Sequence, residues 1–250
     1  IPFLGSRETF FLFGGMLILL GVFGTRKAIF LCFIVIPMAL FFFITPIHAS
    51  PTTEFEGESV YNYIRVQKKP DGTRTLHTNE GLGVQSLYHP FYDLTGYYWD
   101  AAAFLPALNP KGKDFLIIGT AGASSARVLH KFFPNLQLEG VEIDPFMIEV
   151  GNKYFGTSEI PMVINKNDGR VFLDHSKKRY DFIMIDVYRD ELYIPFHLAT
   201  KEFFESVRDH LTSNGAMMMN IAPTSPEAEL LQLISNTVTA PFPFVYEYRA

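Results

Sequence analysis

Two long apolar stretches near the start of the chain set its first fifty residues apart from the rest. Residues 9–25 carry no charged side chain, and residues 28–47 form a second uncharged stretch of about 20 residues. Twenty residues in a helix span about 30 Å, which matches the hydrocarbon core of a bilayer. The first stretch is marginal alone, and it reaches a span if Gly14 and Gly15 lie at a helix contact. The pattern therefore predicts a transmembrane helical hairpin in residues 1–49, with helices at about 9–24 and 28–47.

A buried helical hairpin of a water-soluble protein is the alternative, and it is disfavoured because neither segment has a polar face. Arg26 and Lys27 in the short connection favour a cytoplasmic loop, which would place the following domain outside. The nucleoside chemistry argued below favours the cytoplasmic side instead. We expect a multi-pass membrane protein that contacts membrane lipid and has a cytoplasmic catalytic domain. The missing initiator methionine and the abrupt end at Ala250 indicate a fragment of a longer protein, cut at both ends.

After the hairpin, the pattern changes twice. Residues 50–58 are polar and predict a linker. Residues 59–97 contain three short runs of strand character, separated by turn sequences such as PDG, and predict a small antiparallel β-layer. Residues 98–250 then form the main domain, whose first segment, from Tyr98 to Leu108, has helical character.

The main domain alternates continuous apolar runs with amphipathic helices. The runs are DFLIIG (114–119), LEGVEID (138–144), MVINKND (162–168), YDFIMID (180–186) and AMMMNI (216–221). Apolar strands of this kind, each followed by a helix, are typical of a parallel sheet that is covered on both faces. The sequence therefore predicts an α/β fold with a doubly wound parallel sheet.

Composition and charge narrow the class of protein further. The chain is 48 % hydrophobic and 19 % charged, which excludes a disordered protein, and its single cysteine, Cys32, excludes a disulfide scaffold and a multi-cysteine zinc site. Residues 1–50 hold three basic groups and one acidic group, so the remaining 200 residues hold 18 basic and 25 acidic groups. A domain with a net charge of −7 is a poor candidate for binding nucleic acid, and no nucleic-acid partner is expected.

The residues with chemical potential lie where the predicted strands end, which is where open parallel sheets bind ligands. Gly119 begins a glycine turn that opens a helix, whose free N–H groups favour an electron-rich ligand group. Glu142 ends the second strand, where a carboxylate can accept both hydroxyls of a ribose. Asp168 and Gly169 end the third strand and suit an adenine amino group and a flat base. Asp186 ends the fourth strand inside an apolar run, a setting typical of a functional acid.

Each of these residues also has a purely structural interpretation. The glycines fit a tight strand-to-helix turn, Glu142 fits a solvated strand end, and Asp186 fits a carboxylate that caps the next loop. The turn lacks the full G-x-G-x-x-G spacing and a nearby basic residue, which disfavours a dinucleotide with its pyrophosphate. The favoured ligand is a nucleoside without phosphates, such as an adenosyl sulfonium.

In combination, the segments VYNYIRV, GVQ, YYWD, VEID, NDGRVFL, YDFIMID and PFHLATKEFF resemble the polyamine aminopropyltransferases, the spermidine and spermine synthases. The resemblance covers roughly residues 58–250 and is to the membrane-fused version of the family. It implies a class I S-adenosylmethionine-dependent methyltransferase-like Rossmann fold. It also implies decarboxylated S-adenosylmethionine as co-substrate, no metal, a putrescine-like amine as acceptor and a homodimer. The reaction it implies moves an aminopropyl group to that amine in polyamine biosynthesis.

The resemblance also implies roles for individual residues. Asp186 matches the acid that deprotonates or orients the attacking amine, and Tyr98 matches a tyrosine of the amine channel. Asp190 lies beside the position of a second acid in the same channel. The donor would be held by residues of the turn, of three strand ends and of the β-layer, namely Asn62, Gln85, Gly119, Glu142, Asp168 and Gly169.

Three positions depart from the family pattern. Gly122 stands where the family has an aspartate that meets the amino group of the donor. Leu94 and Thr95 replace an acid pair, although Asp100 keeps an acid nearby. Arg189 replaces the second acid of the channel and adds a repulsion toward a cationic amine. The nucleoside half of the site is therefore better preserved than the amine half.

Two other functions stay open. One is an S-adenosylmethionine-dependent methyltransferase on the same sheet, which the loss of the turn aspartate favours. The other is a non-catalytic module that senses a nucleoside or a polyamine.

Overall fold

The structure is a computed structural model that describes residues 6–25, 50–188, 193–222 and 229–248. The predicted helix at 28–47 lies outside the described residues, and so do Arg189 and Asp190. The predicted helix at 9–24 corresponds to α1, which runs from Ser6 to Thr25.

In the part of the chain that the structure describes, no helix has both the length and the apolar character needed to cross a membrane. In α1, Arg7 and Glu8 occupy the first turn, and the uncharged stretch from Thr9 to Thr25 spans only about 26 Å at the helical rise. That length falls short of the roughly 30 Å of a bilayer core. Within the described residues the predicted transmembrane hairpin is therefore not found, and this finding contradicts the predicted multi-pass membrane location.

The first sheet is antiparallel and has the strand order β1-β2-β3-β4. Its strands are β1 (Thr53–Glu58), β2 (Tyr63–Lys68), β3 (Arg74–Thr78) and β4 (Ser86–Tyr88). The strand β1 lies inside the segment predicted as a linker. It forms because the polar sequence TEFEGE pairs with β2 while Phe55 packs against Phe146 and Tyr154 of α5 (Pro145–Tyr154). The sequence did not predict this strand because an edge strand can carry polar side chains on its exposed side.

The second sheet is parallel and has the order β7-β6-β5-β8-β9, which confirms the predicted parallel α/β sheet. Its strands are β5 (Asp114–Ile118), β6 (Gln137–Glu142), β7 (Met162–Lys166), β8 (Tyr180–Ile185) and β9 (Leu211–Met219). The order reverses at β5, because the chain adds β6 and β7 on one side and β8 and β9 on the other. The carboxyl ends of β5 and β8 therefore lie side by side at the switch point.

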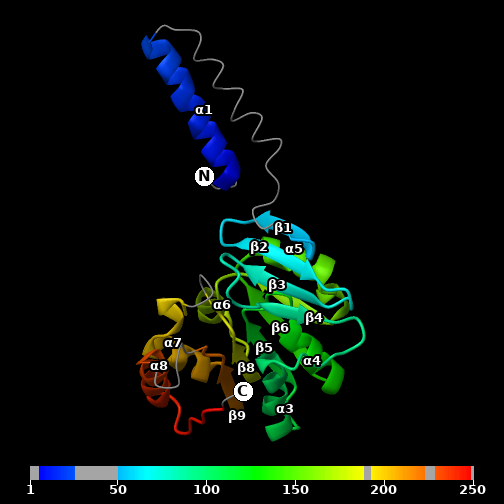
Figure 1. Ribbon diagram of the computed structural model, residues 1–250. Helices are drawn as coiled ribbons and strands as arrows, with labels where there is room; N and C mark the ends of the chain where they lie inside the picture. The colour runs from blue at the N-terminus through cyan, green and yellow to red at the C-terminus, as the bar shows by residue number, and fades with distance from the viewer. Residues whose placement is uncertain (1–5, 26–49, 189–192, 223–228, 249–250) are drawn as a thin grey trace.

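Helices cover both faces of this sheet, as Figure 1 shows. Alternate residues of β5 point to opposite faces: Leu116 and Ile118 belong to one buried cluster, and Phe115 and Ile117 belong to another. The helical elements of the domain are η2 (Tyr98–Ala103), α3 (Phe104–Leu108), α4 (Ser124–Phe132), α5 (Pro145–Tyr154), η3 (Thr157–Glu159), α6 (Gly169–His175), η4 (Phe196–Leu198), α7 (Lys201–Asp209) and α8 (Glu229–Thr239). The antiparallel sheet packs against α5 through a third cluster that includes Ile64, Leu76 and Met147.

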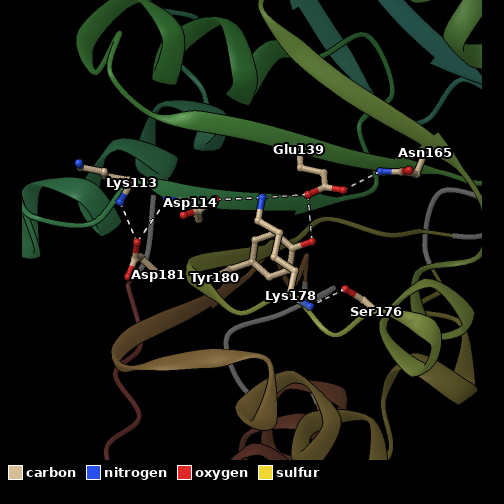
Figure 2. Close-up of polar contacts among 8 residues, drawn as sticks. All are labelled: Lys113, Asp114, Glu139, Asn165, Ser176, Lys178, Tyr180 and Asp181. Atoms are coloured by element: carbon tan, nitrogen blue, oxygen red, sulfur yellow. Dashed lines mark hydrogen bonds and ion pairs between the residues drawn. The ribbon is translucent and has the colours of Figure 1, made fainter.

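A polar network ties β5, β6, β7 and β8 together (Figure 2). The fully buried Tyr180 donates its hydroxyl to Glu139 Oε2 at 3.0 Å, and Asn165 donates to Glu139 Oε1 at 3.0 Å. Lys178 bridges Glu139 at 3.2 Å and Asp114 at 2.9 Å. Every polar atom named here has a partner, so we interpret this network as structural.

Candidate active site

The turn between β5 and α4 forms the floor of the candidate site. Gly119 has φ +87°, and a side chain there would collide with the main-chain carbonyl of Asp186. Glycine is therefore required both for the conformation and for the close approach of the β8 end. Ala121 and Ala123 also have positive φ, at 44° and 62°. An alanine in this region costs about 1–2 kcal/mol, so the turn is strained at two further positions.

Glu142 holds this turn in place. Its Oε2 accepts hydrogen bonds from the N–H groups of Thr120 at 3.2 Å and Ala121 at 2.9 Å, and its Oε1 accepts one from Asp144 N–H at 3.1 Å. The side chain is buried, and burial raises the pKa of its carboxyl above the usual value, against the lowering effect of these hydrogen bonds. Glu142 thus supports the turn from behind.

The carboxyl end of β7 carries Asp168 and Gly169, as the sequence predicted. Asp168 Oδ1 accepts hydrogen bonds from Arg170 N–H at 2.9 Å and Val171 N–H at 3.1 Å, so it caps α6. Gly169 is buried where a side chain would collide with Ile118 of β5. The other oxygen, Asp168 Oδ2, lies 2.9 Å from His197 Nε2. Burial alone would raise the pKa of this carboxyl, but the hydrogen bond from Val171 and the pairing with His197 outweigh burial, so the pKa is lowered.

Asp186 follows β8 and lines an open pocket together with Gln85, Trp99 and the turn from Gly119. Asp186 is the one charged residue among the described residues that line this pocket. Tyr98 donates its hydroxyl to Asp186 Oδ2 at 3.1 Å, and Asn220 donates its amide to Oδ1 at 3.0 Å. Burial raises the pKa of Asp186 to about 6, although the hydrogen bonds from Asn220, Tyr98 and Trp99 lower it.

Asn220 was missed by the sequence analysis. It follows β9, and its N–H bonds the carbonyl of Ile185 at 2.9 Å, which fixes it beside the end of β8. Tyr188 donates its hydroxyl to the carbonyl of Asn220 at 3.0 Å and locks the same segment. No motif surrounds Asn220 in the sequence, and only the strand order β8-β9 brings it to Asp186.

Of the predicted residues that the structure describes, Gln85, Gly119 and Asp186 line this pocket, and Asn62, Tyr98, Glu142, Asp168 and Gly169 are not among its lining residues. Asn62 donates its amide to Asp144 Oδ2 at 3.2 Å and accepts a hydrogen bond from Asn79 at 3.4 Å. This network joins the antiparallel sheet to the N-terminus of α5, which Asp144 caps. Asp190 lies outside the described residues. The binding roles predicted for both residues stay predictions.

The structure explains two of the three departures from the family pattern. Gly122 N–H donates to Ser86 Oγ at 2.8 Å, and a Cβ at this glycine would lie 2.8 Å from Ser86 Cβ. A side chain at position 122 is therefore excluded by β4. Asp100 accepts hydrogen bonds from Thr95 N–H, Thr95 Oγ1 and Gly96 N–H at 2.7–2.9 Å, so it braces the preceding turn.

Within the described ranges, no group of three or more His, Cys, Asp or Glu side chains is arranged to hold a metal ion. The candidate site therefore consists of a strained glycine turn, two strand-end acids and a half-buried carboxylate held by an amide and a phenol. Such a site is suited to binding a nucleoside and to placing one proton acceptor beside it.

Comparisons with known proteins identify the family of this chain. Residues 100–250 match the model of the spermine/spermidine synthase domain. A protein of Bifidobacterium longum described as a probable polyamine aminopropyl transferase is 37 % identical over 190 residues, which are 75 % of this chain and 42 % of the relative. The chain thus spans less than half the length of that curated relative.

More distant similarities fix the fold. The crystal structure of a spermidine synthase in complex with the transition-state analogue AdoDATO has a TM-score of 0.65 and 22 % identity, over 77 % of this chain and 66 % of that one. An eEF1A lysine and N-terminal methyltransferase of Xenopus laevis is 29 % identical over 152 residues, which are 56 % of this chain and 22 % of the relative.

These matches confirm the predicted methyltransferase-like Rossmann fold with its additional antiparallel sheet, and they give no support to the membrane-fused version of the family. The chain belongs to the spermine/spermidine synthase domain family, which is a family of transferases.

Proposed function

We propose that this domain transfers an aminopropyl group from decarboxylated S-adenosylmethionine to an amine. The observation that carries the proposal is the position of Asp186: its carboxylate lines the pocket, at the carboxyl end of β8 and beside the turn from Gly119. A nucleoside bound on the turn and the strand ends would present its sulfonium to this carboxylate. The match to the spermine/spermidine synthase domain supports the same reaction.

In this reaction the lone pair of the amine attacks the methylene carbon beside the sulfonium. The new C–N bond forms as the C–S bond breaks, and the sulfur leaves as the neutral thioether of methylthioadenosine. The amine arrives as an ammonium with a pKa near 10 and must lose a proton, which we assign to Asp186. Raising the pKa of Asp186 from 3.8 to about 6 makes this proton transfer more favourable by about 3 kcal/mol.

We propose the remaining roles from the contacts of Asp186 and from the resemblance to the family. Asn220 and Tyr98 orient the carboxylate of Asp186, and Tyr98 also borders the path of the amine. Gln85 and the turn from Gly119 contact the donor. Glu142 keeps the turn in place from behind, and we assign it to the ribose hydroxyls on the resemblance to the family alone. Asp168 and Gly169 receive the adenine.

The test is an assay of methylthioadenosine release with decarboxylated S-adenosylmethionine and a set of diamines. We expect turnover by the wild-type chain and its loss in Asp186→Asn. Asp174→Asn changes an exposed acid on α6 and serves as the matched control, for which we expect unchanged turnover. If no amine yields a product, the domain is not an aminopropyltransferase, and a non-catalytic sensor of nucleosides or polyamines becomes the better account.

A second candidate is methyl transfer from S-adenosylmethionine itself. Gly122 favours it, because β4 leaves no room there for the aspartate that would select a donor without a carboxylate. The similarity to an eEF1A lysine and N-terminal methyltransferase points the same way. Calorimetric titration with both donors separates the candidates: tighter binding of the decarboxylated donor supports aminopropyl transfer, and tighter binding of S-adenosylmethionine supports methyl transfer.

A further inference from the structure

A histidine from the β8–α7 connection contacts the acid at the end of β7. His197 Nε2 lies 2.9 Å from Asp168 Oδ2. The other oxygen, Oδ1, is already used by two main-chain N–H groups at the start of α6. Oδ2 is therefore the oxygen of Asp168 that can accept a hydrogen bond from a ligand. The imidazole of His197 fixes the orientation of this oxygen.

His197 is itself held firmly at this place. Arg170 donates to the main-chain carbonyl of His197 at 3.0 Å and lies 3.4 Å from Thr200 Oγ1. The next residue, Leu198, is 3 % exposed and packs in the core. The main chain of η4 is thus fixed to α6 without the imidazole, so the imidazole bond is not needed to hold the loop.

The His197–Asp168 pair also stays open to a ligand. The side chains are 36 % and 22 % exposed, at the edge of the sheet where the strand ends bind ligands. A carboxylate oxygen has two lone pairs, so Oδ2 can accept one hydrogen bond from His197 and a second from a base. The imidazole bond fixes the direction of the lone pair that remains.

We propose that His197 is a positioning residue for base recognition, which presents Asp168 Oδ2 to the amino group of an adenine. This inference rests on the proposed function, because that function places adenine at Asp168. His197 contacts neither the sulfonium nor the amine in this arrangement. Its loss therefore weakens binding of the nucleoside and leaves the transfer step unchanged.

The experiment measures the Kd of methylthioadenosine by calorimetry, together with kcat and the KM of the decarboxylated donor, in three variants. His197→Leu removes the imidazole N–H that donates a hydrogen bond to Asp168. We expect the Kd of methylthioadenosine and the KM of the decarboxylated donor to rise about threefold to tenfold, while kcat stays within twofold. His197→Gln keeps an N–H near the position of Nε2, and we expect values within twofold of wild type. His175→Leu, an exposed histidine at the other end of α6, is the control and should change nothing.

Several outcomes would overturn the inference. An unchanged Kd in His197→Leu shows that the imidazole does not position Asp168, while the proposed function stands if turnover persists. A Kd in His197→Gln as high as that in His197→Leu also shows that no N–H at the position of Nε2 positions Asp168. If His197→Leu fails to fold, His197→Asn replaces it, because the side-chain amide of asparagine lies near the position of Nδ1 and not near that of Nε2. Equal Kd values for His197→Asn and His197→Gln would then contradict the inference. If the wild type turns over but shows no measurable binding of methylthioadenosine, the inference about His197 is refuted and the proposed function stands. If the wild type shows neither turnover nor binding, the proposed function is refuted.

Discussion

Replacing Tyr98 by phenylalanine tests how the site controls its proton acceptor. The change removes one hydroxyl and leaves the ring in place. That hydroxyl donates to Asp186 Oδ2 at 3.1 Å, and it favours the ionised carboxylate against the effect of burial. A hydrogen bond to a charged group contributes about 1.5–3 kcal/mol, and 1.36 kcal/mol corresponds to one pKa unit. Because Asn220 still donates to Oδ1, we take the lower value and expect the pKa of Asp186 to rise by about one unit.

The sign of the effect on activity follows from the role of Asp186. The carboxylate accepts a proton only when it is ionised, so activity falls as the pH drops through its pKa. In the wild type, the acid side of the kcat profile should reach half its maximum near pH 6, where the pKa of Asp186 lies. In Tyr98→Phe this midpoint should move to about pH 7.

The assay is methylthioadenosine release at saturating donor and amine, from pH 5 to pH 9. Tyr97→Phe is the matched control, because Tyr97 is the neighbouring tyrosine and is 53 % exposed. Its profile should coincide with that of the wild type. An acid midpoint that does not move in Tyr98→Phe, at whatever rate, would refute the assignment of Asp186 as the titrating base.

Three substitutions test the scaffold under the site by urea unfolding. Ala121→Gly should stabilise the fold by about 0.5–1 kcal/mol, because glycine relieves the positive φ of the turn at a smaller entropic cost; a loss of stability would show that the turn is unstrained. Gly119→Ala should destabilise it by about 2–5 kcal/mol and abolish nucleoside binding, because the new methyl group meets the carbonyl of Asp186; wild-type stability would exclude this close approach. Tyr180→Phe should cost about 1–2 kcal/mol by removing the buried hydroxyl from Glu139 without changing kcat; an altered kcat would connect that network to the site.

Much of the domain was predictable because its central strands, β5 and β8, are buried on both faces. Runs such as FLIIG and FIMID have no alternation, and that pattern fixed the parallel sheet and the strand ends at which Asp168 and Asp186 lie. The sequence did not predict strand β1 because an edge strand with one half-buried aromatic, Phe55, has the composition of a linker. The prediction of a membrane span in α1 depended on a helix contact at Gly14 and Gly15, because its apolar stretch alone is shorter than a bilayer core; within the described residues no spanning helix is found.

The contacts that complete the site depend on strand order and on packing between layers. Asn220 reaches Asp186 only because β9 pairs with β8, 34 residues away in the sequence. Gly122 is confined by Ser86, which comes from the other sheet. Neither relation leaves a periodic or local signal in a single sequence. The pairing of His197 with Asp168 depends likewise on the path of the β8–α7 connection.

The most direct test of the central claim is the mass of the amine product. The intact chain is incubated with decarboxylated S-adenosylmethionine and a diamine, and the amines are then analysed by mass spectrometry. The account predicts a diamine that has gained one aminopropyl group, with an equal amount of methylthioadenosine, and no such product from Asp186→Asn. An amine that gains a methyl group when S-adenosylmethionine is supplied, or an amine that stays unmodified with either donor, would contradict it.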